Sequence, residues 1–196
     1  MRVLTRSNLM GPCTLVVVMV VLASVCALAQ YKTVTYEAIA YGEGRQMAQS
    51  YGIKIVITGY STFEDRDALM KVFLEKGSQG LADALKKMPS LGKLSFTGEA
   101  DYDIRYVKVI PTDTGRTIRV VTDRFVTGAE ARGRTNLSYA DYNLSVVELN
   151  IGNDKKKSTG TFLPACEFLM TKDKGIEVQA YRNPWRLDYI TEKTGD

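Results

Sequence analysis

The chain of 196 residues contains no histidine. A Ser-His-Asp triad, a Cys-His pair and a His-ligated metal site are therefore excluded, because each of them needs an imidazole. A phosphate-binding glycine loop is also missing, since Gly42-Glu43-Gly44 lacks the lysine and the spacing of either nucleotide fingerprint. These absences favour a protein without a catalytic residue, a metal ion or a cofactor.

Cysteine is scarce, with three residues in the whole chain. Cys13 and Cys26 lie in an apolar N-terminal stretch that we expect to be removed, so Cys166 alone remains and no disulfide within the chain can form. Cys166 stands in the apolar run 161–169, which is typical of a buried thiol. A reactive thiol would need a neighbouring cation or a helix N-terminus to lower its pKa.

The excess of positive charge is small, at a formal net charge of +4. Loss of residues 1–29, which include Arg2 and Arg6 and no acid, lowers that charge to +2. A nucleic-acid-binding domain usually carries a concentrated basic stripe, so this near-neutral balance argues against a nucleic acid as partner.

Residues 1–29 have the pattern of a secretory signal peptide. Arg2 and Arg6 form a positive start, residues 13–29 are apolar, and Ala27 and Ala29 supply the small residues of a cleavage site before Gln30. An uncleaved membrane anchor is the alternative, although 17 apolar residues are at the lower limit for spanning a bilayer. We therefore expect a secreted or periplasmic protein whose residues 30–196 form one domain, with no stable membrane insertion after cleavage.

Most of residues 30–196 have the composition and the alternation of β-strands. Ile53, Ile55 and Ile57 alternate with polar neighbours, which predicts a strand with one buried face. Residues 102–124 are predicted to form an antiparallel hairpin around the turn 111–115, because proline and glycine favour turns there. In 139–151 the apolar positions change parity, which indicates a β-bulge or a strand between two packed layers. Pro164 predicts an edge or a bulge within the strand 159–169.

Residues 61–88 change to a helical period. Ser61 and Glu64 have the spacing of a capping box, and Leu69, Met70, Phe73 and Leu74 are placed on one helical stripe. Gly77 ends this first helix, and a second helix runs to Pro89. About nine strands against two helices predict an α+β fold dominated by strands, either a curled antiparallel sheet or a barrel-like β domain with the helical pair inserted.

Glu99, Asp101 and Asp103 form the densest acidic cluster. Their period-two spacing would place all three carboxylates on one face of an extended segment, where they could bind a hard cation or pair an acid with a base. The alternative is a solvated turn, because runs of charge usually lie on solvated faces.

Two functions follow from these residues. The favoured one is a non-catalytic binding or structural domain for a small amphipathic ligand or a glycan, held among the strand tyrosines, with Trp185 in the core. The alternative is a carboxylate-dependent hydrolase of glycans that uses Glu99, Asp101 and Asp103, because that chemistry needs no histidine.

The leader pattern gives a direct prediction for the mature N-terminus. Signal peptidase cuts after a small residue, so protein recovered from outside the cytoplasm should begin at Gln30, free or cyclised to pyroglutamate. Intact-mass and N-terminal peptide mass spectrometry measure this. Recovery of a membrane-extracted form that still begins at Met1 would support the anchor instead.

Overall fold

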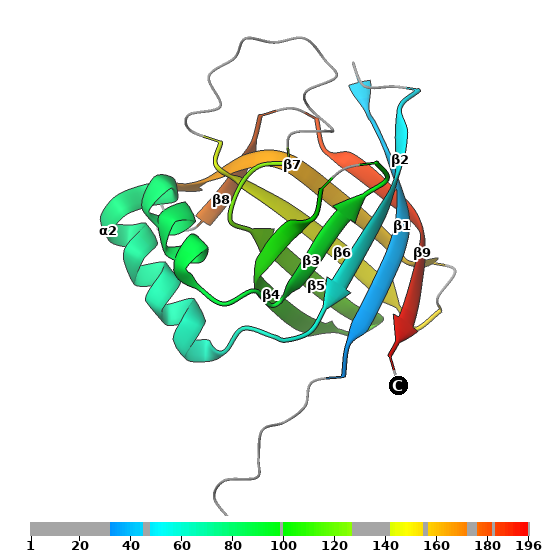
Figure 1. The fold of residues 1–196 in the computed structure, drawn as a ribbon, viewed down its shortest axis with the longest axis horizontal. Helices are drawn as coiled ribbons and strands as arrows, with labels where there is room; N and C mark the ends of the chain where they lie inside the picture. Colours follow the sequence, from blue (N-terminus) through cyan, green and yellow to red (C-terminus); the bar gives the residue numbers. More distant parts are fainter. Residues whose placement is uncertain are drawn as a thin grey trace, which may run out of the picture. The chain divides into compact units, whose positions relative to one another are not determined.

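Eight antiparallel strands close into a barrel in the computed structural model of the chain, which describes residues 32–44, 48–98, 100–126, 142–154, 157–171, 176–181 and 183–195 (Figure 1). The barrel strands are β1 (Val34–Tyr41), β2 (Ser50–Ile57), β3 (Gly92–Phe96), β4 (Tyr102–Thr112), β5 (Gly115–Thr122), β6 (Leu144–Gly152), β7 (Thr159–Met170) and β9 (Trp185–Thr194). Their order is β6-β5-β4-β3-β2-β1-β9-β7, and a β6–β7 pairing closes the ring. The predicted strand-dominated α+β fold is confirmed in its barrel form. The cleavage site at Ala29 and Gln30 lies outside the described residues.

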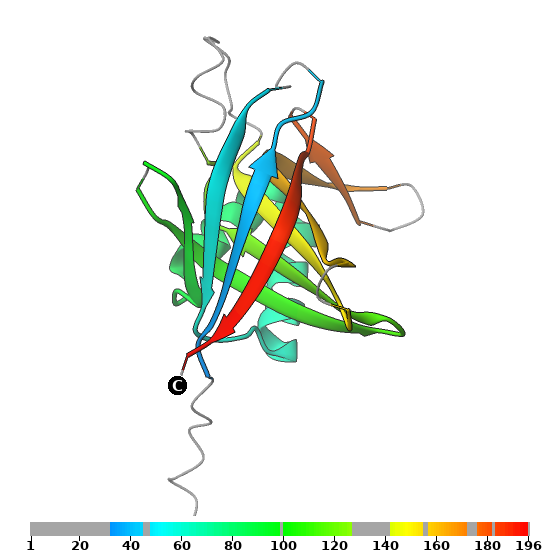
Figure 2. The ribbon, with the colours of Figure 1, turned by 90° about the vertical axis from the view of Figure 1, so that its right-hand side faces the viewer.

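A ninth strand lies outside the ring. β8 (Ile176–Ala180) pairs with the outer half of β7, from Cys166 to Met170, whereas β9 pairs with the first half of β7. Figure 2 shows this β7–β8 hairpin projecting from the barrel wall.

Alternation of side chains fills the barrel with a packed core. Ile53, Ile55 and Ile57 of β2 are at most 2% exposed, as their spacing predicts. Trp185 and Phe162 are fully buried and belong to the same cluster. Trp185 packs against Tyr51 with ring centroids 5.4 Å apart, and Phe162 packs against Phe96 at 5.1 Å. An eight-stranded barrel is just wide enough for such side chains, so its interior is core.

The predicted hairpin 102–124 is confirmed, but its turn is shorter than expected. β4 continues through Pro111 to Thr112, and β5 begins at Gly115, where the prediction had a loop over 111–115. Pro111 pairs with Arg116 as part of the ladder, and the register there is unbroken. Strand pairing therefore extends across residues whose local chemistry favours a turn.

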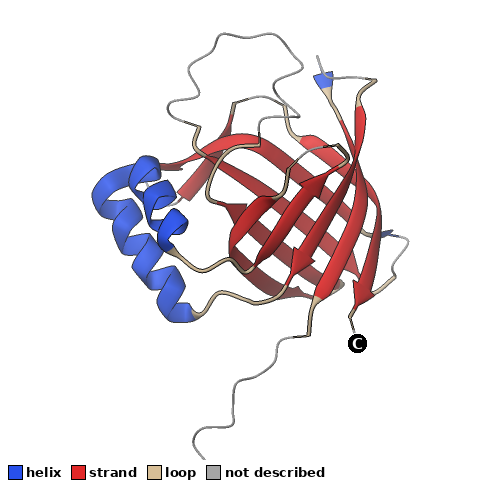
Figure 3. Cartoon of the chain, in the orientation of Figure 1, coloured by secondary structure: helices blue, strands red, loops and turns tan. Residues whose placement is uncertain are grey.

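The helical segment α2 (Phe63–Lys87) is one helix with a kink, and it lies on one side of the strands (Figure 3). The kink is at Gly77, whose φ of 65° and ψ of −162° are non-helical, so the predicted break is confirmed. A positive φ is tolerated by glycine because it has no Cβ. The Ser78 hydroxyl beside the kink accepts a hydrogen bond from the Phe168 N–H of β7, at 3.1 Å.

The predicted capping box is displaced by one residue. Thr62 is the N-cap, and its side chain and that of Asp65 exchange hydrogen bonds with each other's backbone N–H at 3.1 and 2.8 Å. The predicted partner Ser61 instead accepts a hydrogen bond from the Val107 N–H of β4, at 3.0 Å. Both pairs have the required spacing, and the contact of Ser61 with the barrel decides between them.

Two bulges in the barrel wall lie under α2. On β7, Leu163 pairs with Val146 but Cys166 pairs with Leu144, so β7 has one extra residue at Pro164 and Ala165. The predicted bulge at Pro164 is thus confirmed. On β4, the register shifts at Arg105. A bulge re-aims the side chains that follow it.

The change of parity in β6 comes from burial of both of its faces. Val147 and Leu149 point into the barrel, while Leu144 and Val146 belong to an outer cluster with Leu85 of α2. The pairing of β6 with β5 has no register shift, so β6 itself is regular. Of the two predicted explanations, packing between two layers is the correct one for this strand.

The packing of α2 on the barrel predicts that alanine substitution of two neighbouring helix residues lowers stability by different amounts. Phe73 is 4% exposed, and its ring meets that of Phe168 edge-on at 6.5 Å, so Phe73→Ala should lower the free energy of unfolding by about 3–5 kcal/mol. Leu74 was expected on the same stripe but is 58% exposed. Leu74→Ala is therefore the matched control, and it should change the free energy of unfolding by less than about 0.5 kcal/mol. Urea unfolding measures both. A loss below about 1 kcal/mol for Phe73→Ala would contradict packing of α2 on the barrel.

Candidate functional site

The candidate site is a cleft of about 560 Å³ between α2 and the outer face of the barrel. Leu69, Phe73 and Leu85 of α2 line one side of it. Strands β4 to β7 form its floor, and β8 contributes Ile176 and Val178. Its volume falls within the range of about 300–1,000 Å³ that is usual for small-molecule sites.

Strand register arranges the floor of the cleft in two adjacent rows. Successive cross-strand pairs place Tyr106, Val121, Val146 and Leu163 side by side from β4 to β7, which makes an apolar row. The next outward-facing row, two residues along each strand, has charged and polar side chains: Lys108, Arg119, Glu148 and Thr161. The floor is therefore amphipathic, with an abrupt boundary between the rows.

The bulge in β7 supplies the far wall of the cleft. Before it, the odd-numbered Leu163 faces outward, and after it the even-numbered Cys166 does, with Phe168 packed against the same outer cluster. Phe168 pairs with Val178 of β8, so the β7–β8 hairpin continues the apolar surface beyond the barrel. Val178 remains 38% exposed and Ile176 44% exposed, which leaves this wall open to solvent.

The bulge in β4 positions the C-terminal end of α2. Arg105 donates a hydrogen bond to the Met88 carbonyl at the C-cap of α2 (2.8 Å) and pairs with Asp123 (2.9 Å). Its side chain is 17% exposed and that of Asp123 is 12% exposed. This partly buried contact holds α2 at a set distance from β4.

Positive charge gathers where the polar row meets α2. Arg119 pairs with Glu148 at 2.7 Å, whereas the Lys108 ammonium lies over the ring of Phe63, 4.4 Å from its centroid. Arg66 of α2 lines the same part of the cleft. Burial raises the pKa of Tyr106 in the adjoining apolar row, and the charges of Arg66 and Arg119 oppose that rise.

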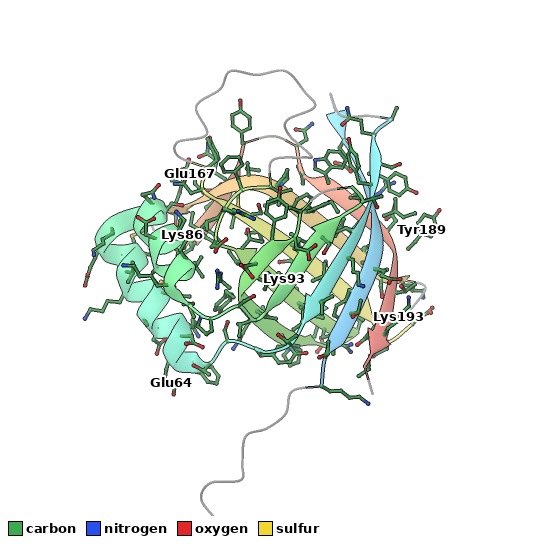
Figure 4. The ribbon with its side chains drawn as sticks, viewed as in Figure 1. Glu64, Lys86, Lys93, Glu167, Tyr189 and Lys193 are labelled. Carbon is green, nitrogen blue, oxygen red and sulfur yellow. The ribbon has the colours of Figure 1, made fainter. Side chains whose placement is uncertain are left out.

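Asp101 and Asp103 of the acidic cluster that the sequence singled out do not line this cleft. Asp101 accepts a hydrogen bond from Ser95 at 2.6 Å, and Asp103 pairs with Lys93 (labelled in Figure 4) at 2.8 Å and with Arg105 at 3.3 Å. The hydrogen bond from Lys93 lowers the pKa of Asp103, whereas the proton donor of a glycosidase needs a raised pKa. Glu99 lies outside the described residues.

No protein-family model, curated protein or solved structure matches this chain. Within the described residues, no helix is both long enough and apolar enough to span a membrane. Across the same residues, no three Cys, Asp or Glu side chains are grouped so that they could hold a metal ion.

Sequence reasoning did not find the cleft. It placed the ligand among strand tyrosines, yet among the tyrosines that the structure describes only Tyr106 lines the cleft. The available signal was in 144–149, where apolar residues on both parities, Val146 and Val147 among them, required a second layer outside the sheet.

Cys166 belongs to the outer apolar cluster that α2 packs against. Its thiol is fully buried, and burial raises its pKa to about 12. Because the thiolate is the reactive form, labelling by a thiol reagent should be slow at pH 8 in the native protein and fast after denaturation. The measurement compares the labelling rate of the native protein in buffer with that of the protein unfolded in urea. Fast native labelling, or a dimer that reductant removes, would contradict the inert assignment.

Proposed function

We propose that this protein is a non-catalytic binding domain that holds a small amphipathic ligand in the cleft between α2 and the barrel. The observation that carries the proposal is the amphipathic floor, an apolar row beside a charged row. Ligand sites are mostly apolar with a few polar groups that fix orientation, which is the arrangement of this cleft. The packed barrel core supports placing the ligand outside the barrel.

The lining favours a flexible apolar chain over a glycan. Leucine, valine and isoleucine side chains dominate it, and its aromatic residues are Phe73, Tyr106 and Phe168. A sugar needs hydrogen-bond partners for its hydroxyl groups, because polar groups that lose water without replacement are costly. An alkyl chain has no such requirement and gains from burial of each methylene.

We further infer that binding takes place outside the cytoplasm, in the secreted or periplasmic form that begins at Gln30. The charged start, apolar stretch and Ala27-x-Ala29 ending of the leader support this location. An exported carrier would meet amphiphiles released from membranes or taken up from the surroundings.

A neutral apolar fluorophore tests the site without involving charge. N-phenyl-1-naphthylamine should bind to the mature protein with an increase in fluorescence, because its emission rises in apolar surroundings. Val178→Trp, which adds bulk to an exposed position in the cleft wall, should weaken this binding by about tenfold. Fluorescence titration measures the dissociation constant.

The matched control is Ile39→Trp on β1. Ile39 is 37% exposed, close to the 38% of Val178, but it does not line the cleft. This variant should bind the probe like the unchanged protein. Absence of saturable probe binding, or equal loss in both variants, would rule out the cleft as the binding site.

A further inference from the structure

We propose that the ligand is a single-chain amphiphile with an anionic head, such as a medium- or long-chain carboxylate, and that Lys108 and Arg66 bind its head. This inference rests on the proposed function and specifies the ligand's chemical class. It is carried by the distribution of charge along one edge of the cleft.

The row order sets the orientation of such a ligand. Val121 and Val146 belong to the apolar row, and the polar row that contains Lys108 and Arg119 is two residues away on the same strands. Alternate residues of one strand face the same side, about 7 Å apart. A chain lying over the apolar row and the β7–β8 wall therefore places its head beside Lys108.

Lys108 and Arg119 form a cross-strand pair of like charge, which is unfavourable in a sheet. Glu148 compensates Arg119 through the 2.7 Å ion pair. Lys108 instead contacts the ring of Phe63. This cation–π contact does not neutralise the charge of Lys108. An anionic head beside Lys108 would complete the alternation of charge along this row.

Arg66 adds the second unneutralised cation. Within the described residues its guanidinium has no carboxylate partner among the ion pairs. Glu148 is already paired with Arg119, and the acidic residues of the first turn of α2, Glu64 and Asp65, do not line the cleft. Three cations against one carboxylate line the cleft, which favours an anion there.

The test compares three ten-carbon amphiphiles that differ in head charge. Decanoate, 1-decanol and decylammonium, each kept below its aggregation concentration, are titrated against bound N-phenyl-1-naphthylamine. Decanoate should displace the probe with about tenfold higher affinity than decanol, because hydrogen bonds to charged groups are stronger. Decylammonium should be the weakest of the three.

Lys108→Gln should weaken decanoate by about tenfold and leave decanol unchanged, while Lys108→Arg should restore decanoate binding. Lys54→Gln is the matched control, since Lys54 is an exposed lysine of β2 that does not line the cleft. It removes the same net charge, so any loss shared by Lys108→Gln and Lys54→Gln is a long-range effect and would contradict direct binding of the head.

The outcomes separate this inference from the proposed function. Equal affinity for decanoate and decanol, unaffected by Lys108→Gln, would overturn the anionic head and leave the binding domain standing. Failure of all three amphiphiles and of the probe would overturn both. Sedimentation of a dimer that Val178→Trp dissociates, without amphiphile binding, would also overturn both, because a second copy would then cover the cleft.

Discussion

The outer apolar surface depends on one inserted residue in β7. At Pro164 and Ala165 the strand changes the parity of the side chains that face outward, so Cys166 joins Leu163 on the outer side. Without the bulge, Cys166 would point toward the barrel interior, because strand side chains alternate. The Pro164 carbonyl accepts hydrogen bonds from the Val126 N–H and the Ser145 hydroxyl, at 2.8 and 2.7 Å, which hold the bulge in place.

The second bulge adapts the barrel to the helix that covers this surface. Arg105 is re-aimed by the register shift in β4, and its guanidinium reaches the Met88 carbonyl. At the other end of α2, Ser61 is bonded to Val107 of the same strand. Both ends of the helix are thus attached to β4, while Ser78 at the kink is attached to Phe168 of β7. The helix is therefore attached to the barrel at both ends and at its kink.

Local patterns in the sequence were sufficient to predict the fold class but not the closure of the sheet into a barrel. The alternation of Ile53, Ile55 and Ile57 predicted a buried face, and Gly77 predicted the break in the helix, because both signals are local. Whether Ser61 or Thr62 caps α2 depended on a contact with Val107, which lies far along the chain. Closure of the ring through β6 and β7 is likewise a long-range property.

The candidate site was harder to predict than the fold for the same physical reason. Arg66, Lys108 and Arg119 come from three elements, and only the strand register and the covering helix bring them to one edge. The acidic triplet was predicted as a possible catalytic site because its members are close in sequence. Asp103, however, is neutralised by Lys93 and Arg105, which indicates a structural role.

The two layers around β6 allow a direct test of where the ligand lies. Val146 faces the cleft and its neighbour Val147 faces the barrel core. In protein with ¹³C-labelled methyl groups and bound decanoate, nuclear Overhauser effects from the alkyl chain should reach Val146 and Val121. They should be missing at Val147 and Val120. Effects at Val147 and Val120 instead, or at none of the four, would contradict a ligand held between α2 and the barrel.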